Sequence, residues 1–322
     1  MKARLEFLDA ILLLILVLGM ICIPFMLSGY EIKLATTITI QVGLAVALGL
    51  VVGPAGLTSV GHAAFYGLAA YVLAMMAPKS APADLLLTAA VAIVAAALFA
   101  AVVGAISIRS RGMYFILMTL AFGQLGYHFF HDTGVGGSAD GAYVDFRPEL
   151  NLLGDYISFD SAATFYRLVS IAVIVVIAVC WWLRRSAFGS VLLAARDNEQ
   201  RTRAFGYSPY LLRLIAFVIS GAMAGAMGYL TAAQHGYVAP QMLAWHASAI
   251  ALVMVLIGGK DTTSGPAIGA IILLLAEEVL QRYTEHWLFG VGLIIVAVVI
   301  AAPNGLVPYL ARLFGTGRAD HV

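Results

Sequence analysis

The sequence predicts an all-α polytopic membrane protein with about ten transmembrane helices, in the range of eight to ten. Of its 322 residues, 62% are hydrophobic and only 11% are charged, whereas soluble domains carry about 25% charged residues. Uncharged runs recur along the chain, and a run of about 20 apolar residues crosses the ~30 Å hydrocarbon core as a helix. A chain with so little charge cannot cover a globular surface with polar groups, which argues against a water-soluble enzyme.

The predicted spans follow the charge-free runs in order. The first run, residues 10–30, is too long for the apolar region of a cleavable signal peptide, so we interpret it as a first helix that is retained. Fewer than ten spans result if the segments beside Gly53 or Gly259 are half-helices, and we expect some helices to be discontinuous. The spans are placed in residues 10–30, in 34–78 (two, separated at 53–56), in 85–108, 112–131 and 168–183, in 214–259 (two, separated at 235–240), and in 262–281 and 286–302.

Orientation follows from Lys and Arg, which are enriched in short cytoplasmic loops. The segment 184–213 holds six arginines, so we place it in the cytoplasm. Alternation of the spans then puts both termini in the cytoplasm and the loop 131–166 outside, where six acidic residues face a single basic one, Arg147. The sequence therefore predicts one membrane domain over residues 1–322, with most of its basic residues on the inner side.

The cytoplasmic segment is predicted to hold a short helix between two spans. Residues 190–205 lack Gly and Pro, Gly206 can end the helix in a left-handed conformation, and Ser208-Pro209 suits the start of the next span. The helix could lie on the membrane surface with its arginines near lipid phosphates, or dock into a partner protein. Asp197 and Glu199 are unfavourable beside an anionic surface and favour a protein partner.

The outer loop, residues 131–166, has four glycines within residues 134–141. Glycine permits positive φ and close backbone approach. The loop is therefore either a flexible connector or a rim that meets a soluble partner or substrate.

Two hydrophobic stretches, residues 53–67 and 258–266, are interrupted by glycine, proline and polar residues. Transporters often place paired broken helices in corresponding positions of two structural repeats, so these stretches suggest an internal repeat. His62 either bonds a neighbouring helix or faces a substrate path. From their polarity and depth, the residues that could line such a path are Ser59, Gly61, His62 and Phe65.

The sequence carries no recognisable catalytic, cofactor or metal motif. Gly258-Gly259-Lys260 lacks the upstream glycine of a phosphate-binding loop, and His-x-x-x-His, Gly-x-Ser-x-Gly and Cys/His metal spacings are absent. Cys22 and Cys180 lie in apolar runs as small packed side chains, and the net charge of +1 gives no reason to expect nucleic acid. We therefore expect no enzyme, and an energy source that is either an ion gradient or another chain.

Five ordered motifs resemble those of one family. Residues 56–71 (GLTSVGHAAFYGLAAY) are similar to its signature GLxSxGHAAFxGxGAY. The other four motifs are residues 109–115 (RSRGMYF) with 119–124 (TLAFGQ), residues 185–189 (RSAFG) with 195–199 (ARDNE) and Gly206, residues 217–225 (FVISGAMAG), and residues 302–306 (APNGL). The family is the membrane permease subunit of branched-chain amino-acid ABC importers, LivM type, and the resemblance covers nearly the whole chain.

The resemblance implies a single permease domain over residues 1–322 in the bacterial inner membrane, with 131–166 as a periplasmic loop facing a substrate-binding protein. It implies a second homologous permease subunit and two cytoplasmic ATP-binding subunits, which hold ATP and Mg, and no cofactor in this chain. Ser190 stands where a basic residue is expected, a departure that concerns one coupling contact. The outer loop aligns ambiguously with the shorter loop of the family, so no residue that docks the binding protein is transferred. Segment 185–206 would be the coupling helix seated in an ATPase groove, with Arg196, Asp197, Asn198, Glu199 and Gly206 as coupling residues.

The expected function is import of branched-chain amino acids by alternating access. An alternative within the class is a permease for urea or short-chain amides. From a different class, Glu277 or Glu278 near the end of a span could couple a secondary transporter to protons, although the two could equally pair locally at the interface. A passive channel for a small polar solute is the third alternative.

Overall fold

The computed structural model describes residues 2–110, 112–152 and 155–313, so residue 111, inside one of the motifs, lies outside the described part. Apolar runs form helices because, in lipid, each backbone polar group must be satisfied within its own segment. The helices are α1 (Lys2–Met26), α2 (Tyr30–Val52), α3 (His62–Met76), α4 (Leu85–Ser107), α5 (Met113–Asp132), α6 (Ala162–Arg185), α7 (Ala187–Asp197), α8 (Glu199–Ala204), α9 (Pro209–His235), α10 (Trp245–Gly258), α11 (Ser264–Tyr283), α12 (Trp287–Ala301) and α13 (Leu306–Leu313).

Seven helices of the described chain are long and apolar enough to cross a membrane, namely α1, α2, α4, α5, α6, α9 and α11. The shorter apolar helices α3, α10 and α12 occupy the remaining predicted spans. The 15 residues of α3 and the 14 of α10 reach only about 22 Å at 1.5 Å per residue, less than the ~30 Å core. The predicted class, an all-α polytopic membrane protein, is confirmed.

Several helices extend past the charge-free runs that predict the spans. The charge-free criterion starts a span after Arg167, but α6 begins at Ala162 and includes this residue, whose guanidinium lies 5.8 Å from the centre of the Phe25 ring. Similarly, α9 begins at Pro209 and includes Arg213. A long cationic side chain near a helix end can reach the polar boundary, so a charge there does not end the helix.

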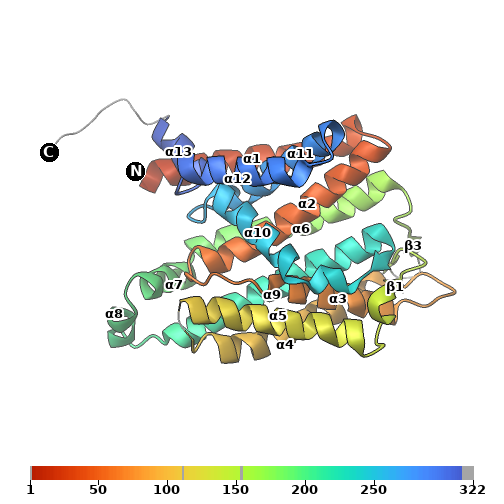
Figure 1. Ribbon diagram of the computed structural model, residues 1–322, viewed down its shortest axis with the longest axis horizontal. Coiled ribbons are helices and arrows are strands. Elements are labelled where there is room, and N and C mark those ends of the chain that lie inside the picture. Colours follow the sequence, from red (N-terminus) through yellow and green to blue (C-terminus); the bar gives the residue numbers. More distant parts are fainter. Residues whose placement is uncertain (1, 111, 153–154, 314–322) are drawn as a thin grey trace.

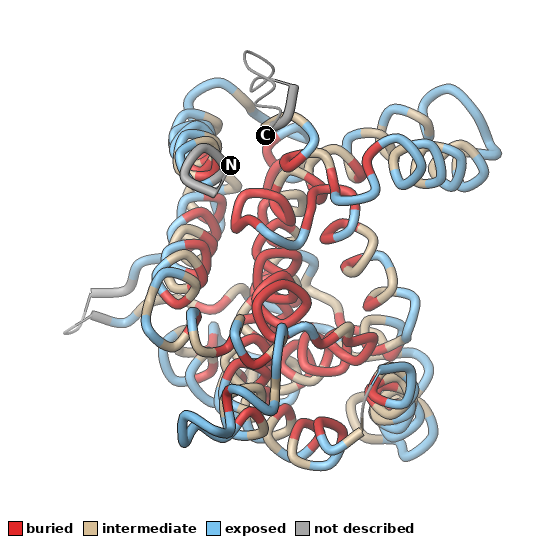
Figure 2. The backbone as a smooth tube through the Cα atoms, turned by 90° about the vertical axis from the view of Figure 1, so that its left-hand side faces the viewer, coloured by how far each residue is buried: buried red, intermediate tan, exposed pale blue. Residues whose placement is uncertain are grey.

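The long helices run between two opposite ends of the molecule (Figure 1). The inner helices α7 and α8 lie at the same end as the start of α1 and as α13, and the strands of the outer loop lie at the other end. Buried residues gather at the centre and exposed ones on the surrounding helices (Figure 2), and α2 is the most deeply buried of the seven long helices. On α9, Gly221 and Gly225 face Ala100 and Ala96 of α4, because small residues allow such close approach.

The described residues of the outer loop have defined secondary structure. After a short 3-10 turn, η1 (Ser138–Asp140), strand β1 (Ala142–Tyr143) pairs antiparallel with β4 (Tyr237–Val238), which follows α9. Strands β2 (Leu150–Leu152) and β3 (Asp155–Ile157) form a second antiparallel pair. Arg147 donates to the carbonyls of Phe159 and Asp160 at 2.9 and 3.0 Å. These contacts fasten the loop between the outer ends of α6 and α9.

The inner segment forms two helices where the sequence predicts one over residues 190–205. Helix α7 starts earlier than expected because Ser186 caps it, accepting a hydrogen bond from Gly189 N at 3.3 Å. Helix α7 then ends at Asn198, whose backbone is extended (φ −151°). The Asn198 Oδ1 accepts a hydrogen bond from Arg201 N at 2.9 Å and so caps the start of α8. Asparagine favours such a break because its side chain competes with the helical backbone for hydrogen bonds.

The predicted end of this segment is confirmed. Gly206 has φ +86°, the left-handed region that favours glycine after a helix. The amides of Gly206 and Tyr207 donate to the carbonyls of Arg203 and Thr202 at 2.9 and 3.3 Å, which is the hydrogen-bond pattern of a Schellman motif. As predicted, Ser208 caps α9 and Pro209 occupies its first turn.

Candidate functional site

Helices α7 and α8, residues 187–206, form an amphipathic unit that we call the inner helix pair. Leu192 and Ala195 are fully buried against the bundle, and Thr202 anchors α8 with 4% of its surface exposed. The other side of the pair, including Ser190 and Arg201, is exposed. A helix that buries one narrow face and presents the other to solvent is suited to bind a groove on a partner.

The five predicted coupling residues separate into two groups. Asp197, Asn198 and Gly206 are exposed, with 65% of the Asp197 side chain accessible. Arg196 and Glu199 turn inward, with side-chain exposures of 30% and 19%. The sequence places all five on one short segment but does not predict that two of them face the rest of the helix bundle.

Glu199 fastens α8 to its neighbours. One carboxylate oxygen accepts from Arg203 at 2.6 Å, and the other lies 3.5 Å from Nη1 of Arg213 on α9. Arg213 also donates to the carbonyl of Ala195 at 3.2 Å. Both members of the Glu199–Arg213 pair are mostly shielded from water, so α8 is held at a fixed angle to α9.

Two aromatic side chains that the sequence reasoning left unassigned stand at the tip of the inner helix pair. Phe205 is 76% exposed and Tyr207 is 51% exposed, one on each side of Gly206. The signal in the sequence is a pair of large aromatic residues around a capping glycine in an otherwise charged segment that is predicted to be cytoplasmic. Such exposed aromatic groups are typical of contact surfaces.

His62 is fully buried at the start of α3, between two serine hydroxyls. Its Nδ1 lies 2.9 Å from Ser59 Oγ, and its Nε2 lies 2.8 Å from Ser220 Oγ on α9. Ser220 donates its own hydrogen to the carbonyl of Ala47 on α2 at 2.6 Å. Ser220 must therefore accept from Nε2–H, so in the neutral imidazole Nδ1 is the acceptor for the Ser59 hydroxyl. The ring thus links α2, α3 and α9, and its two hydrogen bonds are to hydroxyl groups, not to carboxylates.

The broken start of α3 is satisfied by hydroxyl groups from two further helices. Val60 N donates to Thr119 Oγ1 of α5 at 3.2 Å, and Ala63 N donates to Ser248 Oγ of α10 at 2.8 Å. Each unpaired backbone group at membrane depth costs roughly several kcal/mol, so these two amides need the hydroxyl acceptors. Sequence reasoning assigned no role to Thr119, which opens the motif at 119–124, or to Ser248, an isolated hydroxyl in an apolar run.

The four predicted pathway residues are brought together, but they lie inside the chain. Ser59, His62 and Phe65 have no exposed surface, and Gly61 leaves no room for a side chain because the Thr119 backbone lies against it. The Phe65 and Phe217 rings contact His62 edge-on, with centroids at 5.3 and 5.4 Å.

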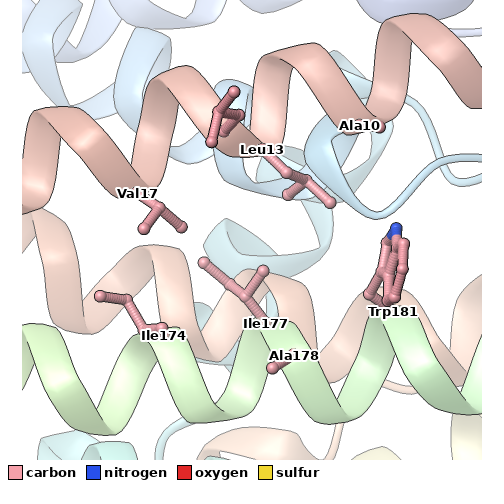
Figure 3. A pocket seen from close by; sticks show the side chains of 8 residues that line it. Ala10, Leu13, Val17, Ile174, Ile177, Ala178 and Trp181 are labelled. Carbon is pink, nitrogen blue, oxygen red and sulfur yellow. The ribbon is translucent and has the colours of Figure 1, made fainter.

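Two apolar crevices lie elsewhere on the bundle. One of about 280 Å³ runs between α1 and α6, where Leu13 and Val17 face Ile174 and Ile177, and Trp181 closes one end (Figure 3). Another of about 400 Å³ lies between α1, α2 and α11 and contains one charged side chain, Glu31. Neither includes a predicted pathway residue, and their apolar walls suit lipid chains.

The arrangement supplies no chemistry for a covalent reaction. Among the described residues no group of three or more His, Cys, Asp or Glu side chains could hold a metal ion. His62 has no carboxylate partner that would orient it as a general base. The polar groups instead join helices and fix the inner helix pair, which is the kind of arrangement a transport subunit needs.

Comparison with known proteins identifies the family. Residues 31–302 match the model described as "Branched-chain amino acid transport system / permease component". The chain belongs to this family. The permease is 28% identical over 305 residues to the high-affinity branched-chain amino acid transport system permease protein LivM of Escherichia coli K12, covering 88% of this chain and 72% of the relative. The LivM protein of Salmonella typhimurium LT2 gives the same figures.

A second group of relatives is covered only in part. The autoinducer 2 import system permease protein LsrC of Yersinia pestis is 31% identical over 138 residues, which are 40% of this chain and 39% of the relative. No solved structure matches significantly. The permease is thus a multi-pass, non-catalytic membrane component of a bacterial ABC importer, a class whose permease subunits carry no cofactor and work with ATPases and a binding protein.

Proposed function

We propose that the permease imports branched-chain amino acids across the bacterial inner membrane by alternating access. The observation that carries the proposal is the family match over residues 31–302, supported by the LivM relatives that cover 88% of the chain. Two cytoplasmic ATPase subunits would supply the energy, a second homologous permease would complete the pathway, and a periplasmic binding protein would deliver the substrate. No covalent step falls on this chain.

The proposal includes a topology of ten spans in one domain with both termini in the cytoplasm. Its support is the placement of α1 and α13 at the same end as the arginine-rich inner helix pair, opposite the acidic outer loop. The short helices α3 and α10 would complete their crossings with the irregular segments before them, which for α10 include η2 (Pro240–Leu243).

The inner helix pair would be the coupling element seated in an ATPase groove. Asp197 and Asn198 would contact the ATPase directly, and the exposed ring of Phe205 would provide an apolar anchor beside them. Glu199 and Gly206 would position the inner helix pair without contacting the ATPase. Glu199 holds α8 on α9, and Gly206 turns the chain back to the membrane. Arg196 is assigned a different partner in the next subsection.

The coupling assignment is tested by purifying the tagged permease in mild detergent and identifying the chains that remain bound. We expect a second permease and two ATPases with the wild type. In a variant with Asp197→Ala and Phe205→Ala, the ATPases should be lost while the second permease stays. A matched control, Lys79→Ala, changes an exposed residue in the connection between α3 and α4, outside the inner helix pair. Retention of the ATPases by the double variant would refute the assignment.

We also propose that Ser59, Gly61, His62 and Phe65 border the substrate path. Their position at the break before α3, at membrane depth, supports this. Because all four are buried in the present arrangement, they would reach the path only when α3 separates from α5 or α9 during the cycle. Unchanged transport in a His62→Gln variant that assembles normally would remove this proposal.

Substrate class is tested with the whole complex in proteoliposomes. The binding protein is added outside the vesicles, and ATP is enclosed inside them. Uptake of labelled leucine, isoleucine or valine is the expected result, and the same vesicles without ATP are the control. Uptake of urea or acetamide in place of the amino acids would move the permease to the alternative substrate class.

Gradient-driven uptake by the isolated chain would instead support a secondary transporter. The local geometry argues against a proton relay through Glu278, because this carboxylate lies 2.9 Å from Arg282 and accepts from the Tyr30 hydroxyl at 3.2 Å. This carboxylate is therefore already engaged by a guanidinium and a hydroxyl near the end of α11. A Glu278→Gln variant is therefore expected to transport normally, whereas loss of gradient-driven uptake in Glu277→Gln would support the secondary transporter.

A further inference from the structure

We propose that Arg196 is a positioning residue that transmits movement of the inner helix pair to two loops. These are residues 53–61, between α2 and α3, and residues 259–263, between α10 and α11. The inference rests on the proposed function, since the movement would come from the ATPases. It differs from the role that the sequence motif suggested for Arg196, which was a contact with the ATPase. The evidence is the direction of this side chain and the convergence of both loops upon it.

Arg196 leaves α7 toward the bundle and contacts both loops. Its Nη1 donates to the Gly53 carbonyl at 2.8 Å and lies 3.6 Å from a carboxylate oxygen of Asp261. The first distance is that of a charge-assisted hydrogen bond, among the stronger contacts that a side chain makes. The second joins two partly exposed groups and contributes little stability by itself. The Arg196 stem also packs on Gly56, which leaves no room for a side chain there.

The two loops also touch each other. Gly53 packs directly against the Lys260 carbonyl, and Arg184, at the inner end of α6, donates to that same carbonyl at 3.0 Å. Neither α2 nor α10 has a basic residue in its own last turn, although a cation there complements the helix dipole. Arg196 and Arg184 bring that charge from other helices, so α6, α7 and both loops form one joined unit.

Each loop leads directly into a helix that begins inside the bundle. The 53–61 loop ends at His62 and the start of α3, and the 259–263 loop ends at Ser264 and the start of α11. The amide of Ser264 is held by Asp9 of α1 at 2.8 Å, and Asp9 is only 8% exposed. A shift of α7 by its partner would therefore pull on two helix starts at once, through contacts made by one guanidinium.

The test compares Arg196→Ala with Arg109→Ala, which removes an exposed arginine from the α4–α5 connection. Arg196→Ala should keep both ATPases and their basal ATP hydrolysis, whereas amino-acid uptake and the stimulation of hydrolysis by loaded binding protein should fall at least tenfold. Arg109→Ala should behave as wild type. Asp261→Asn, which removes only the weaker contact and keeps the fold, should lower uptake about two- to fivefold.

A direct readout is the labelling of Lys260→Cys by a maleimide in a background with Cys22 and Cys180 replaced. Lys260 is exposed and only its backbone carbonyl is bonded, so the substitution preserves the contact. ATP should change the labelling rate in the complex, and Arg196→Ala should abolish that change. Persistence of the ATP effect in this variant, or wild-type uptake, would overturn the inference.

Two further outcomes separate this inference from the proposed function. Selective loss of the ATPases in Arg196→Ala would show that the residue is a docking contact, which overturns the inference but supports the coupling assignment. Absence of ATPases from the wild-type preparation would refute the proposed function itself.

Discussion

The two hydrogen bonds of His62 predict how much stability the ring nitrogens contribute. His62→Phe keeps an aromatic ring between Phe65 and Phe217 and removes the bonds to Ser59 and Ser220. Side-chain hydrogen bonds between membrane helices contribute about 0.6 kcal/mol on average and about 1.7 kcal/mol at most. Two of them give an expected loss of about 1–3 kcal/mol in the free energy of unfolding.

His62→Ala is expected to cost more, because it also removes the ring from a packed site with no exposed surface. Truncation of a buried aromatic side chain costs about 3–5 kcal/mol, since a cavity remains. The difference between the alanine and phenylalanine variants therefore separates packing from hydrogen bonding at this position.

The assay is unfolding of the purified permease in mixed micelles by titration with sodium dodecyl sulfate. A double-mutant cycle of His62→Phe with Ser220→Ala should give a coupling energy of about 0.6–1.7 kcal/mol. His286→Phe, at an exposed histidine that makes no capping hydrogen bond, should stay within about 0.5 kcal/mol of wild type. Wild-type stability of His62→Phe, or a coupling energy of zero, would refute the assigned network.

Three other outcomes follow from single contacts. Gly221→Val places a side chain where Ala100 already packs and should cost about 1–3 kcal/mol in the same titration, whereas Gly292→Ala, in open space within a helix, should be neutral or stabilising. Gly206→Ala must adopt φ +86°, so a cost of about 1 kcal/mol and weaker ATPase retention are expected; full retention would contradict the capping role. Arg147→Ala should speed proteinase K cleavage of the outer loop without releasing the ATPases, and unchanged cleavage would argue against its tethering role.

Each of the seven helices that are long and apolar enough to cross a membrane, among the described residues, overlaps a charge-free run, because both helix formation and burial in lipid depend on local composition. The same criterion failed at Arg167 and Arg213, where a long side chain crosses from the helix end to a partner or to the polar boundary. The capping residues Gly206, Ser208 and Pro209 were predictable since they act on neighbouring backbone groups. Asn198 acts in the same way, but helix-forming neighbours on both sides masked its effect.

The candidate site was predictable as a set of residues but not as an arrangement. The motif around residues 195–199 indicated a coupling segment, yet Arg196 and Glu199 turn toward the bundle while Asp197 faces outward. Successive side chains of a helix point in different directions. Because Asn198 is extended, the side chains of α8 do not continue the helical periodicity of α7. Phe205 and Tyr207 became candidates only once their exposure was known.

The sequence by itself determined the membrane class, the order of the helices, the family motifs and the C-terminal end of the inner segment, because each depends on residues close together in the chain. The tertiary structure decided the partners of His62 and Arg196, which are 158 and 143 residues away in Ser220 and Gly53. Contacts over such separations depend on how whole helices pack. A buried polar side chain must find a partner somewhere, but one sequence does not say on which helix that partner lies.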